Sequence, residues 1–213
     1  MTTNETPGSH DAAAHDIPST PRRILIADDE HLVATGMVAT LKELGYEVIG
    51  PARNGEQAIA LCREAHPDLA VLDIRMPDLD GLAAAETIYN ELMIPVVMVS
   101  AYSDPDYVNS GNRIGVFGYL LKPVSPDQLR VGLDISWARY LKHIQLAGEV
   151  DSLHDRLEQR KIIEQAKWII VKRKSVEEPE AMKLLQKQAR NGRKPLIDVA
   201  RAVIESENLL GES

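Results

Sequence analysis

The sequence has a single cysteine, Cys62, among its 213 residues. One cysteine excludes an intramolecular disulfide, and such a sequence is typical of proteins that work in a reducing cytoplasm. Cys62 ends the apolar helical pattern Ala58–Cys62, so we interpret it as a buried small hydrophobic residue rather than a nucleophile. The expected location of the protein is therefore the cytoplasm.

Long apolar runs are also missing. No stretch of the sequence approaches the roughly 18 apolar residues that indicate a membrane-spanning helix, so no membrane contact is expected. Residues 1–21 are rich in Thr, Pro, Gly, Ser, Asp and Ala and have no apolar block, which predicts a disordered tail rather than a signal peptide. The formal net charge of -8 argues against binding of nucleic acid by the whole chain, although its regions differ in charge.

The sequence does contain enough apolar residues, 44%, to form a core. From Arg22 to about Tyr140, short apolar runs alternate with amphipathic segments. The expected strands are Ile24–Ala27, Glu47–Gly50, Leu69–Leu72, Val96–Val99 and Val116–Leu121. The expected helices are Leu32–Leu44, Glu56–Glu64, Leu82–Leu92, Pro105–Ile114 and one that begins at Pro126. Repeated βα units predict an α/β domain with a doubly wound, five-stranded parallel sheet, in which the second, more polar strand is an edge and the other four are buried on both faces.

Proline is absent from residues 127–172, and glycine occurs there only as Gly132 and Gly148. This pattern predicts a helix that continues past the sheet domain as a long helical connector. Part of it has apolar residues spaced four, three and four apart, a short heptad-like seam with charged neighbours. The seam consists of Leu146, Val150, Leu153 and Leu157. Two interpretations stay open: an amphipathic helix that packs on its own domain, or a connector that pairs with a second subunit.

The C-terminal part of the chain predicts a small all-α unit. The long helical pattern breaks at Ser175, and Ser175–Glu178 has the spacing of a capping box. Pro179–Arg190 and Pro195–Glu207 have apolar residues at helical spacing, so with the end of the long helix they predict a three-helix domain. The expected organisation is a disordered tail over 1–21, a sheet domain over 22–140, a helical linker or coiled-coil segment over 141–152 and a three-helix domain over 153–208.

Polar side chains follow four of the predicted strands where each strand ends. Asp28 and Asp29 follow the first strand, Asp73 the third, Ser100 the fourth and Lys122 the fifth. Because the carboxyl ends of parallel strands meet at one edge of a sheet, we expect these groups to lie together. Carboxylates are ligands that Mg²⁺ prefers, while a hydroxyl and an ammonium can bind phosphoryl oxygens. Each signal is weak alone, but their joint occurrence strongly favours a site for a divalent metal and a phosphoryl group.

These residues, taken in order, resemble the receiver domain of two-component response regulators. The resemblance covers about Arg23 to Tyr140 and includes Asp28-Asp29, the segment Asp73–Gly81, Ser100-Ala101 and Lys122-Pro123. It implies a flavodoxin-like fold, Mg²⁺ as the cofactor and a cognate histidine kinase as a partner.

The resemblance also implies a role for individual residues. Asp73 would be the phosphoacceptor, and Asp28, Asp29, Asp73 and the main-chain carbonyl of Arg75 would be the metal ligands. Ser100, Lys122 and Tyr119 would bind the phosphoryl group or act as switch residues. Val124 is a departure, because many receivers have an aromatic residue at that position.

The segment from about Val150 onward is richer in Lys and Arg, with the cluster Arg190–Lys194 at a helix junction. Arg160–Lys167, Glu180–Leu185, Gln188–Arg190 and Leu196–Ala200 resemble, in order, the ANTAR domain of transcription antitermination regulators. That resemblance covers about Leu153 to Ile204 and implies binding of paired RNA hairpins. The residues expected to contact RNA are Lys167, Arg190, Asn191, Arg193 and Lys194.

Trp168 departs from the ANTAR pattern, since a glycine commonly follows Ala-Lys in the family. The indole could pack in the three-helix core, stack on a base or obstruct a close helix contact.

The hypothesis is a cytoplasmic response regulator, not an enzyme, that a histidine kinase phosphorylates on Asp73. It would form a homodimer through the long helix, bind paired RNA hairpins and prevent transcription termination. The alternative is a scaffold whose C-terminal helices bind a partner protein and no nucleic acid. A phosphatase on the same fold has less support, because the sequence offers no second catalytic acid beyond the receiver set.

Overall fold

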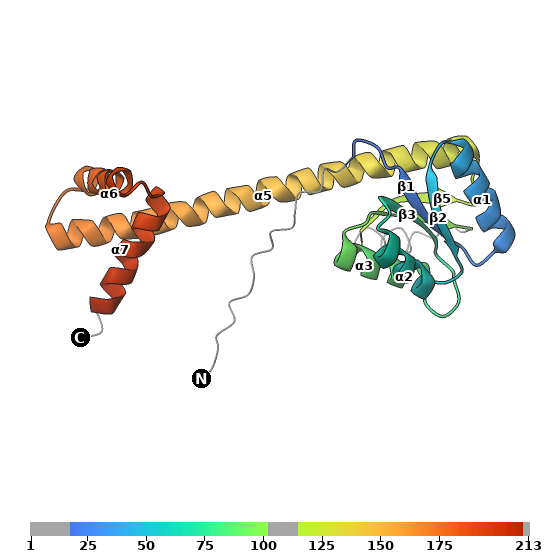
Figure 1. Ribbon diagram of the computed structural model, residues 1–213, viewed down its shortest axis with the longest axis horizontal. Coiled ribbons are helices and arrows are strands. Elements are labelled where there is room, and N and C mark those ends of the chain that lie inside the picture. The colour runs from blue at the N-terminus through green and yellow to red at the C-terminus, as the bar shows by residue number, and fades with distance from the viewer. Residues whose placement is uncertain (1–17, 102–114, 211–213) are drawn as a thin grey trace. The chain divides into compact units, whose positions relative to one another are not determined.

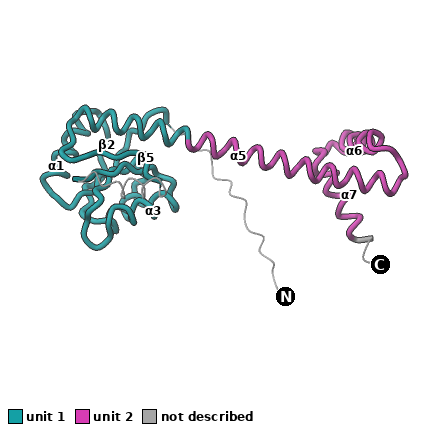
Figure 2. Tube along the Cα trace, turned by 180° about the vertical axis from the view of Figure 1, so that it is seen from behind, with its two compact units in different colours: residues 1–142 teal, residues 143–213 magenta. Residues whose placement is uncertain are grey.

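The structure is a computed structural model that describes residues 18–101 and 115–210 (Figure 1). The chain divides into two compact units, Met1–Lys142 and His143–Ser213 (Figure 2). Most of the predicted tail, residues 1–17, and the predicted helix Pro105–Ile114 lie outside the described residues.

The first unit is built on a five-stranded parallel sheet. Its strands are β1 (Arg23–Ala27), β2 (Glu47–Ala52), β3 (Leu69–Asp73), β4 (Val96–Ser100) and β5 (Val116–Leu121). They are ordered β2-β1-β3-β4-β5, and every neighbouring pair is parallel. The described helices of this unit are α1 (His31–Glu43), α2 (Gly55–Ala65), α3 (Gly81–Leu92) and the beginning of α5 (Pro126–Lys174). The predicted doubly wound sheet is confirmed.

Helices cover both faces of the sheet, as Figure 1 shows: α2 and α3 lie on one face, and α1 and the beginning of α5 on the other. The alternation of side chains along a strand explains why the strands are apolar throughout. In β1, Leu25 and Ala27 join a core that includes Ile88 of α3, whereas Ile24 and Ile26 alternate with them toward the opposite face. All four strand residues are fully buried.

The two edges of the sheet differ in how well the sequence predicts them. The edge position of β2 is confirmed. The prediction that β5 is buried on both faces is wrong, because β5 is the other edge, Phe117 to Leu120 are only partly buried and Leu121 is 54% exposed. Helix α5 packs closely on this strand, since a Cβ on Gly132 would lie 2.6 Å from the side chain of Leu120. The residues of β5 are therefore apolar because helix α5 packs on them. The strand is nevertheless partly exposed, because it lies at the edge of the sheet.

The second unit consists of the end of α5 with α6 (Glu178–Gly192) and α7 (Leu196–Leu210). These three helices share a small apolar core around Ala166, Leu185 and Ala200, each fully buried. The predicted long helix and three-helix domain are confirmed, and α5 runs for 49 residues without interruption. Among the described helices, none is long and apolar enough to cross a membrane.

Gly81 brings the first turn of α3 against the end of β3. Its N–H donates to the carbonyl of Ile74 at 2.9 Å, and a Cβ at this position would lie 1.9 Å from the main-chain oxygen of Asp73. No side-chain rotation relieves a contact with backbone, so only glycine allows this approach.

We therefore expect Gly81→Ala to lower the free energy of unfolding by about 1–3 kcal/mol, the usual range for an overpacked site. The measurement is urea denaturation followed by circular dichroism. The matched control is Gly36→Ala in α1, where an added Cβ meets nothing within 4 Å. Because alanine is favoured over glycine inside a helix, this control should raise the free energy of unfolding by about 0.5–1 kcal/mol. Equal effects of the two substitutions would contradict the steric explanation.

Candidate functional site

The ends of two neighbouring strands bring the predicted acidic residues together. Asp28 and Asp29 follow β1, and Asp73 is the last residue of the adjacent strand β3. One carboxylate oxygen from each of the three lies within 4.8 Å of the others. Asp28 and Asp73 are buried, 1% and 6% exposed, whereas Asp29 is exposed. The edge therefore has two acids held inside the protein and one that faces solvent.

Lys122, directly after β5, reaches back to this acidic cluster. Its ammonium lies 2.8 Å from Oδ2 of Asp28 and 2.8 Å from Oδ2 of Asp73. A third contact, at 3.2 Å, joins it to Oε1 of Glu30. The sequence predicted Lys122 at the site but missed Glu30, whose only signal is its place next to Asp28-Asp29.

Burial and charge shift the pKa values of this ion pair. Burial raises the pKa of Asp28 above its ordinary value, an effect that the hydrogen bonds from Lys122 and from the N–H of Glu30 only partly oppose. Burial alone would lower the pKa of Lys122, but its hydrogen bonds with Asp28 and Asp73 outweigh this and raise it. The ammonium is therefore charged at neutral pH, while the Asp28 carboxylate lies where additional positive charge would stabilise it.

The three carboxylates fit a hard divalent cation. Two oxygens on opposite sides of one Mg²⁺ lie about 4.2 Å apart, because each is about 2.1 Å from the ion. The three oxygens lie within 4.8 Å of one another, which is close to this distance. Oδ2 of Asp28 is fully buried and, within the described parts of the chain, has no partner besides the Lys122 ion pair. In the structure as described, no other cluster of His, Cys, Asp and Glu has this arrangement.

Two more of the predicted residues border the same space. Ser100 and Arg75 line, with Asp29, Asp73 and Lys122, a pocket of about 340 Å³. Ser100 is the last residue of β4 and is buried, 7% exposed, while Arg75 is exposed in the loop after β3. The structure thus brings the predicted hydroxyl, ammonium and carboxylates to one cavity.

Tyr119 and Val124 do not line the 340 Å³ pocket. Tyr119 is in β5, is partly buried and packs against the core on the α2–α3 side of the sheet. Val124 instead lines a neighbouring groove of about 530 Å³ with Lys122, Leu32 and Met37.

In the second unit, four of the five residues predicted to contact RNA lie together at the turn between α6 and α7. Arg190 and Asn191 are in the last turn of α6, and Arg193 caps it in a left-handed conformation, φ 49°. The N–H of Lys194 donates to the carbonyl of Ala189 at 3.0 Å, which fixes the turn. All four side chains are exposed. We call Arg190, Asn191, Arg193 and Lys194 the basic corner.

Lys167 is separated from the basic corner by its burial. It is 6% exposed, and its ammonium is ion-paired with Glu164 and Glu178. These two carboxylates raise the pKa of Lys167. The pair with Glu178 ties α5 to the start of α6, while Glu164 lies on α5 itself. A direct contact between Lys167 and RNA would require both pairs to break.

Trp168 is 54% exposed, so the structure does not place it in the core of the second unit. It stands 11 residues after Leu157, close to three full helical turns, so both side chains lie on the same face of α5. The seam residues of that face are exposed as well, with Leu153 and Leu157 each at 58%.

Comparison with known proteins gives matches over both units. The family model described as "Response regulator receiver domain" matches residues 24–134, and the model described as "ANTAR domain" matches residues 151–204. The "Transcriptional regulatory protein PdtaR" of Mycobacterium tuberculosis is 37% identical over 186 residues, which cover 87% of this chain and 91% of that protein. The "Regulatory protein AtoC" of Escherichia coli is 33% identical over 136 residues, 63% of this chain and 28% of that protein.

Solved structures match the first unit. The signal receiver domain of a modulated diguanylate cyclase from Desulfovibrio desulfuricans G20 has a TM-score of 0.53 at 30% identity and covers 58% of this chain and 98% of that chain. The signal receiver domain of NarL from Mycobacterium tuberculosis has a TM-score of 0.52 at 32% identity, with 55% and 97% covered.

The acidic cluster predicts a specific response to magnesium. The raised pKa of Asp28 means that its ionised carboxylate is less favourable in the folded protein than in the unfolded chain, so at neutral pH this charge lowers the stability of the metal-free protein. Mg²⁺ should raise the melting temperature of the wild type, by an amount equivalent to about 2.7 kcal/mol at a metal concentration 100 times its Kd. Asp28→Asn should abolish this rise and leave the metal-free protein at least as stable. Thermal unfolding with Mg²⁺ or EDTA measures both effects.

Glu86→Gln, on an exposed position of α3, is the control and should keep the full response to Mg²⁺. A rise in melting temperature that survives in Asp28→Asn would refute the metal site.

Proposed function

Because the chain belongs to the response regulators that join a receiver domain to an ANTAR domain, we propose that a histidine kinase phosphorylates it on Asp73 and that it controls gene expression by binding RNA hairpins. The observation that carries the proposed phosphorylation is the position of the Lys122 ammonium between Asp28 and Asp73, 2.8 Å from a carboxylate oxygen of each. The proposed RNA binding is supported by the basic corner at the α6–α7 turn of the C-terminal domain.

Phosphoryl transfer would take place at the carboxylate of Asp73. One of its oxygens attacks the phosphorus of a phosphohistidine, a P–O bond forms, the P–N bond breaks and the imidazole leaves. Asp28, Asp29, Asp73 and the carbonyl of Arg75 would hold Mg²⁺, which when bound neutralises negative charge on the phosphoryl oxygens.

The new phosphoryl group would redistribute the contacts of the site. Lys122 would exchange its carboxylate partners for a phosphoryl oxygen, and the hydroxyl of Ser100 would donate to another. Ser100 ends β4 and Lys122 directly follows β5, so these new contacts would pull on the ends of both strands. Tyr119, partly buried in β5, would change its packing with them.

The output would be an RNA interaction in the cytoplasm. RNA hairpin loops expose phosphates and unstacked bases, which cationic side chains and amides can bind. Arg190, Arg193 and Lys194 of the basic corner offer charge to phosphates, and Asn191 offers a donor and an acceptor to a base. Binding would favour a hairpin that prevents formation of the terminator. Lys167 would stabilise the domain through its ion pairs rather than contact RNA directly.

Pairing of two chains would present two C-terminal domains to paired hairpins. The seam of α5 supports a dimer, because Leu146, Val150, Leu153 and Leu157 are 50% to 63% exposed. Apolar residues at heptad-like spacing gain free energy when they pack into the seam of a second helix. Trp168 lies on the same face of α5 and would extend this contact.

Coupling of the two domains has a direct test at Asp73. Acetyl phosphate and Mg²⁺ should increase the RNA affinity of the wild type, and Asp73→Ala should remove this increase. Without metal and phosphorylation, the wild type and Asp73→Ala should have the same RNA affinity, because Asp73 is not in the RNA-binding domain. Filter binding with RNA enriched by crosslinking to the native protein measures it. An unchanged response in Asp73→Ala would refute phosphorylation as the control.

The seam has its own test. Leu153→Lys with Leu157→Lys places two charges on the exposed apolar face and should make the protein monomeric in sedimentation velocity, also with acetyl phosphate present. Ser152→Lys with Gln159→Lys adds the same charge roughly on the opposite face of α5 and is the matched control. The control should sediment as the wild type does. A dimer that persists in the seam variant would show that another surface mediates pairing.

A further inference from the structure

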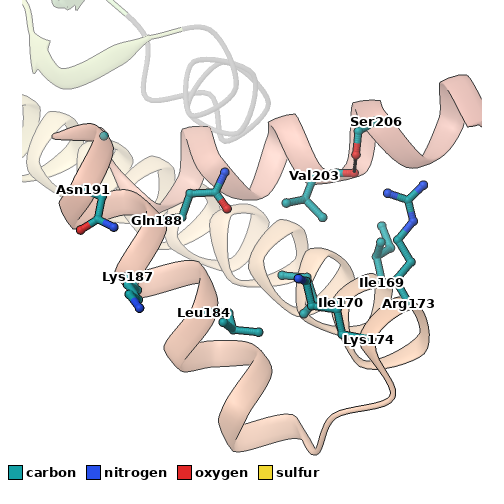
Figure 3. A pocket seen from close by; sticks show the side chains of 11 residues that line it. Ile169, Ile170, Arg173, Lys174, Leu184, Lys187, Gln188, Asn191, Val203 and Ser206 are labelled. Atoms are coloured by element: carbon teal, nitrogen blue, oxygen red, sulfur yellow. Dashed lines mark hydrogen bonds between the residues drawn. The ribbon is translucent and has the colours of Figure 1, made fainter.

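A pocket of about 610 Å³ opens in the second unit where α5, α6 and α7 meet. Its volume lies in the range of about 300–1,000 Å³ that is typical of sites for small organic groups. Each helix contributes side chains from successive turns of one face, and Figure 3 shows them from close by. The basic corner adjoins this pocket, because Asn191 belongs to both.

The inner wall of the pocket is apolar. Ile170 of α5, Leu184 of α6 and Val203 of α7 line it and belong to, or pack against, the apolar core of the unit. Flat aromatic ring systems gain free energy when they leave water for such a surface.

The outer wall carries positive charge and amide groups. Arg173 and Lys187 line the pocket from α5 and α6. The guanidinium of Arg173 is oriented by an ion pair with Glu207, 2.7 Å between Nε and Oε2. Lys187 has no carboxylate within ion-pair distance among the described residues, so its charge is available to an anion.

The two amides on α6 give the pocket a means to recognise a polar edge. Gln188 and Asn191 are three residues apart, one turn of the helix, and both are exposed. Each primary amide can donate and accept hydrogen bonds at the same time, and such groups pair with the edges of nucleobases.

We propose that this pocket receives one unstacked base of an RNA hairpin loop. The ring lies against the wall formed by Ile170, Leu184 and Val203, its edge bonds with Gln188 and Asn191, and its flanking phosphates meet Lys187 and the basic corner. An apolar ring with a polar edge and an adjoining anion uses all three kinds of group, and a nucleotide has this chemistry. This assignment rests on the proposed function, RNA binding by the C-terminal domain, and gives that function a specific place.

The test begins with a pool of RNA hairpins whose loops are fully randomised, selected on the full-length wild-type protein with Mg²⁺ and acetyl phosphate. Gln188→Leu should bind the selected hairpin about tenfold more weakly, the usual value of a lost base contact. The matched control is Gln186→Leu, an exposed residue of α6 outside the pocket lining, which should stay within about twofold. Thermal unfolding of both variants checks that the domain is intact.

Two further readouts separate a base contact from a general effect. Replacement of one loop nucleotide by an abasic nucleotide should weaken binding to the wild type but cause no further loss in Gln188→Leu, because the two changes remove the same contact. Gln188→Leu should also leave the salt dependence of binding unchanged, whereas Lys187→Gln should lower its slope by about one unit.

The possible outcomes separate a failure of the pocket assignment from a failure of the proposed RNA binding. If hairpins are enriched but Gln188→Leu binds them as Gln186→Leu does, the pocket assignment is overturned and RNA binding stands. If Gln188→Leu weakens binding and abasic replacement adds the same loss in both proteins, no base occupies the pocket and the assignment is overturned as well. If no hairpin is enriched on the wild type, RNA binding itself fails and the assignment fails with it.

Discussion

The ammonium of Lys122 is the constraint on which the acidic edge of the sheet depends. Asp28 and Asp73 are both buried, and two buried carboxylates at this separation repel each other strongly unless a cation lies between them. Loss of the ammonium would leave both carboxylates buried without a counter-charge, a change that typically costs about 3–5 kcal/mol, whereas loss of Asp28 alone leaves the ammonium paired with Asp73. The order β2-β1-β3-β4-β5 is what makes the contact possible, because it lets a residue that follows the edge strand β5 cross to the ends of β3 and β1.

A second lysine, Lys167, plays a comparable structural part in the other unit. It too is buried and bonded to two carboxylates, Glu164 and Glu178. The difference lies in the surroundings. Lys122 lines an open pocket and has partners that an incoming phosphoryl group can replace, whereas both partners of Lys167 are on the helices that it joins. Under the proposed function, the same chemical group would serve as a switch in one unit and as a structural tie in the other.

Much of this architecture could be predicted from the sequence, because its signals are local. Apolar runs that end in Asp28, Asp73, Ser100 or Lys122 indicate both the strands and the shared edge. The absence of proline predicted the long helix α5. Signals that depend on tertiary contacts were missed: the apolar run of β5 did not reveal an edge strand, and nothing local to Lys167 indicated Glu178 as its partner. The capping-box prediction for α6 was also wrong. Ser175 has a left-handed conformation, φ 49°, and Glu177 is the N-cap without a side-chain bond.

The exposed seam of α5 also bears on how the concentration of the protein affects its behaviour. A helix with four apolar side chains in solvent gains stability on pairing, and the paired fraction of any such protein rises with its total concentration. Under the proposed dimer, the amount of protein that a cell makes would set how strongly a given degree of phosphorylation is felt at the RNA. Expression level and signal would then act on the same equilibrium, and a cell could adjust its sensitivity through synthesis alone.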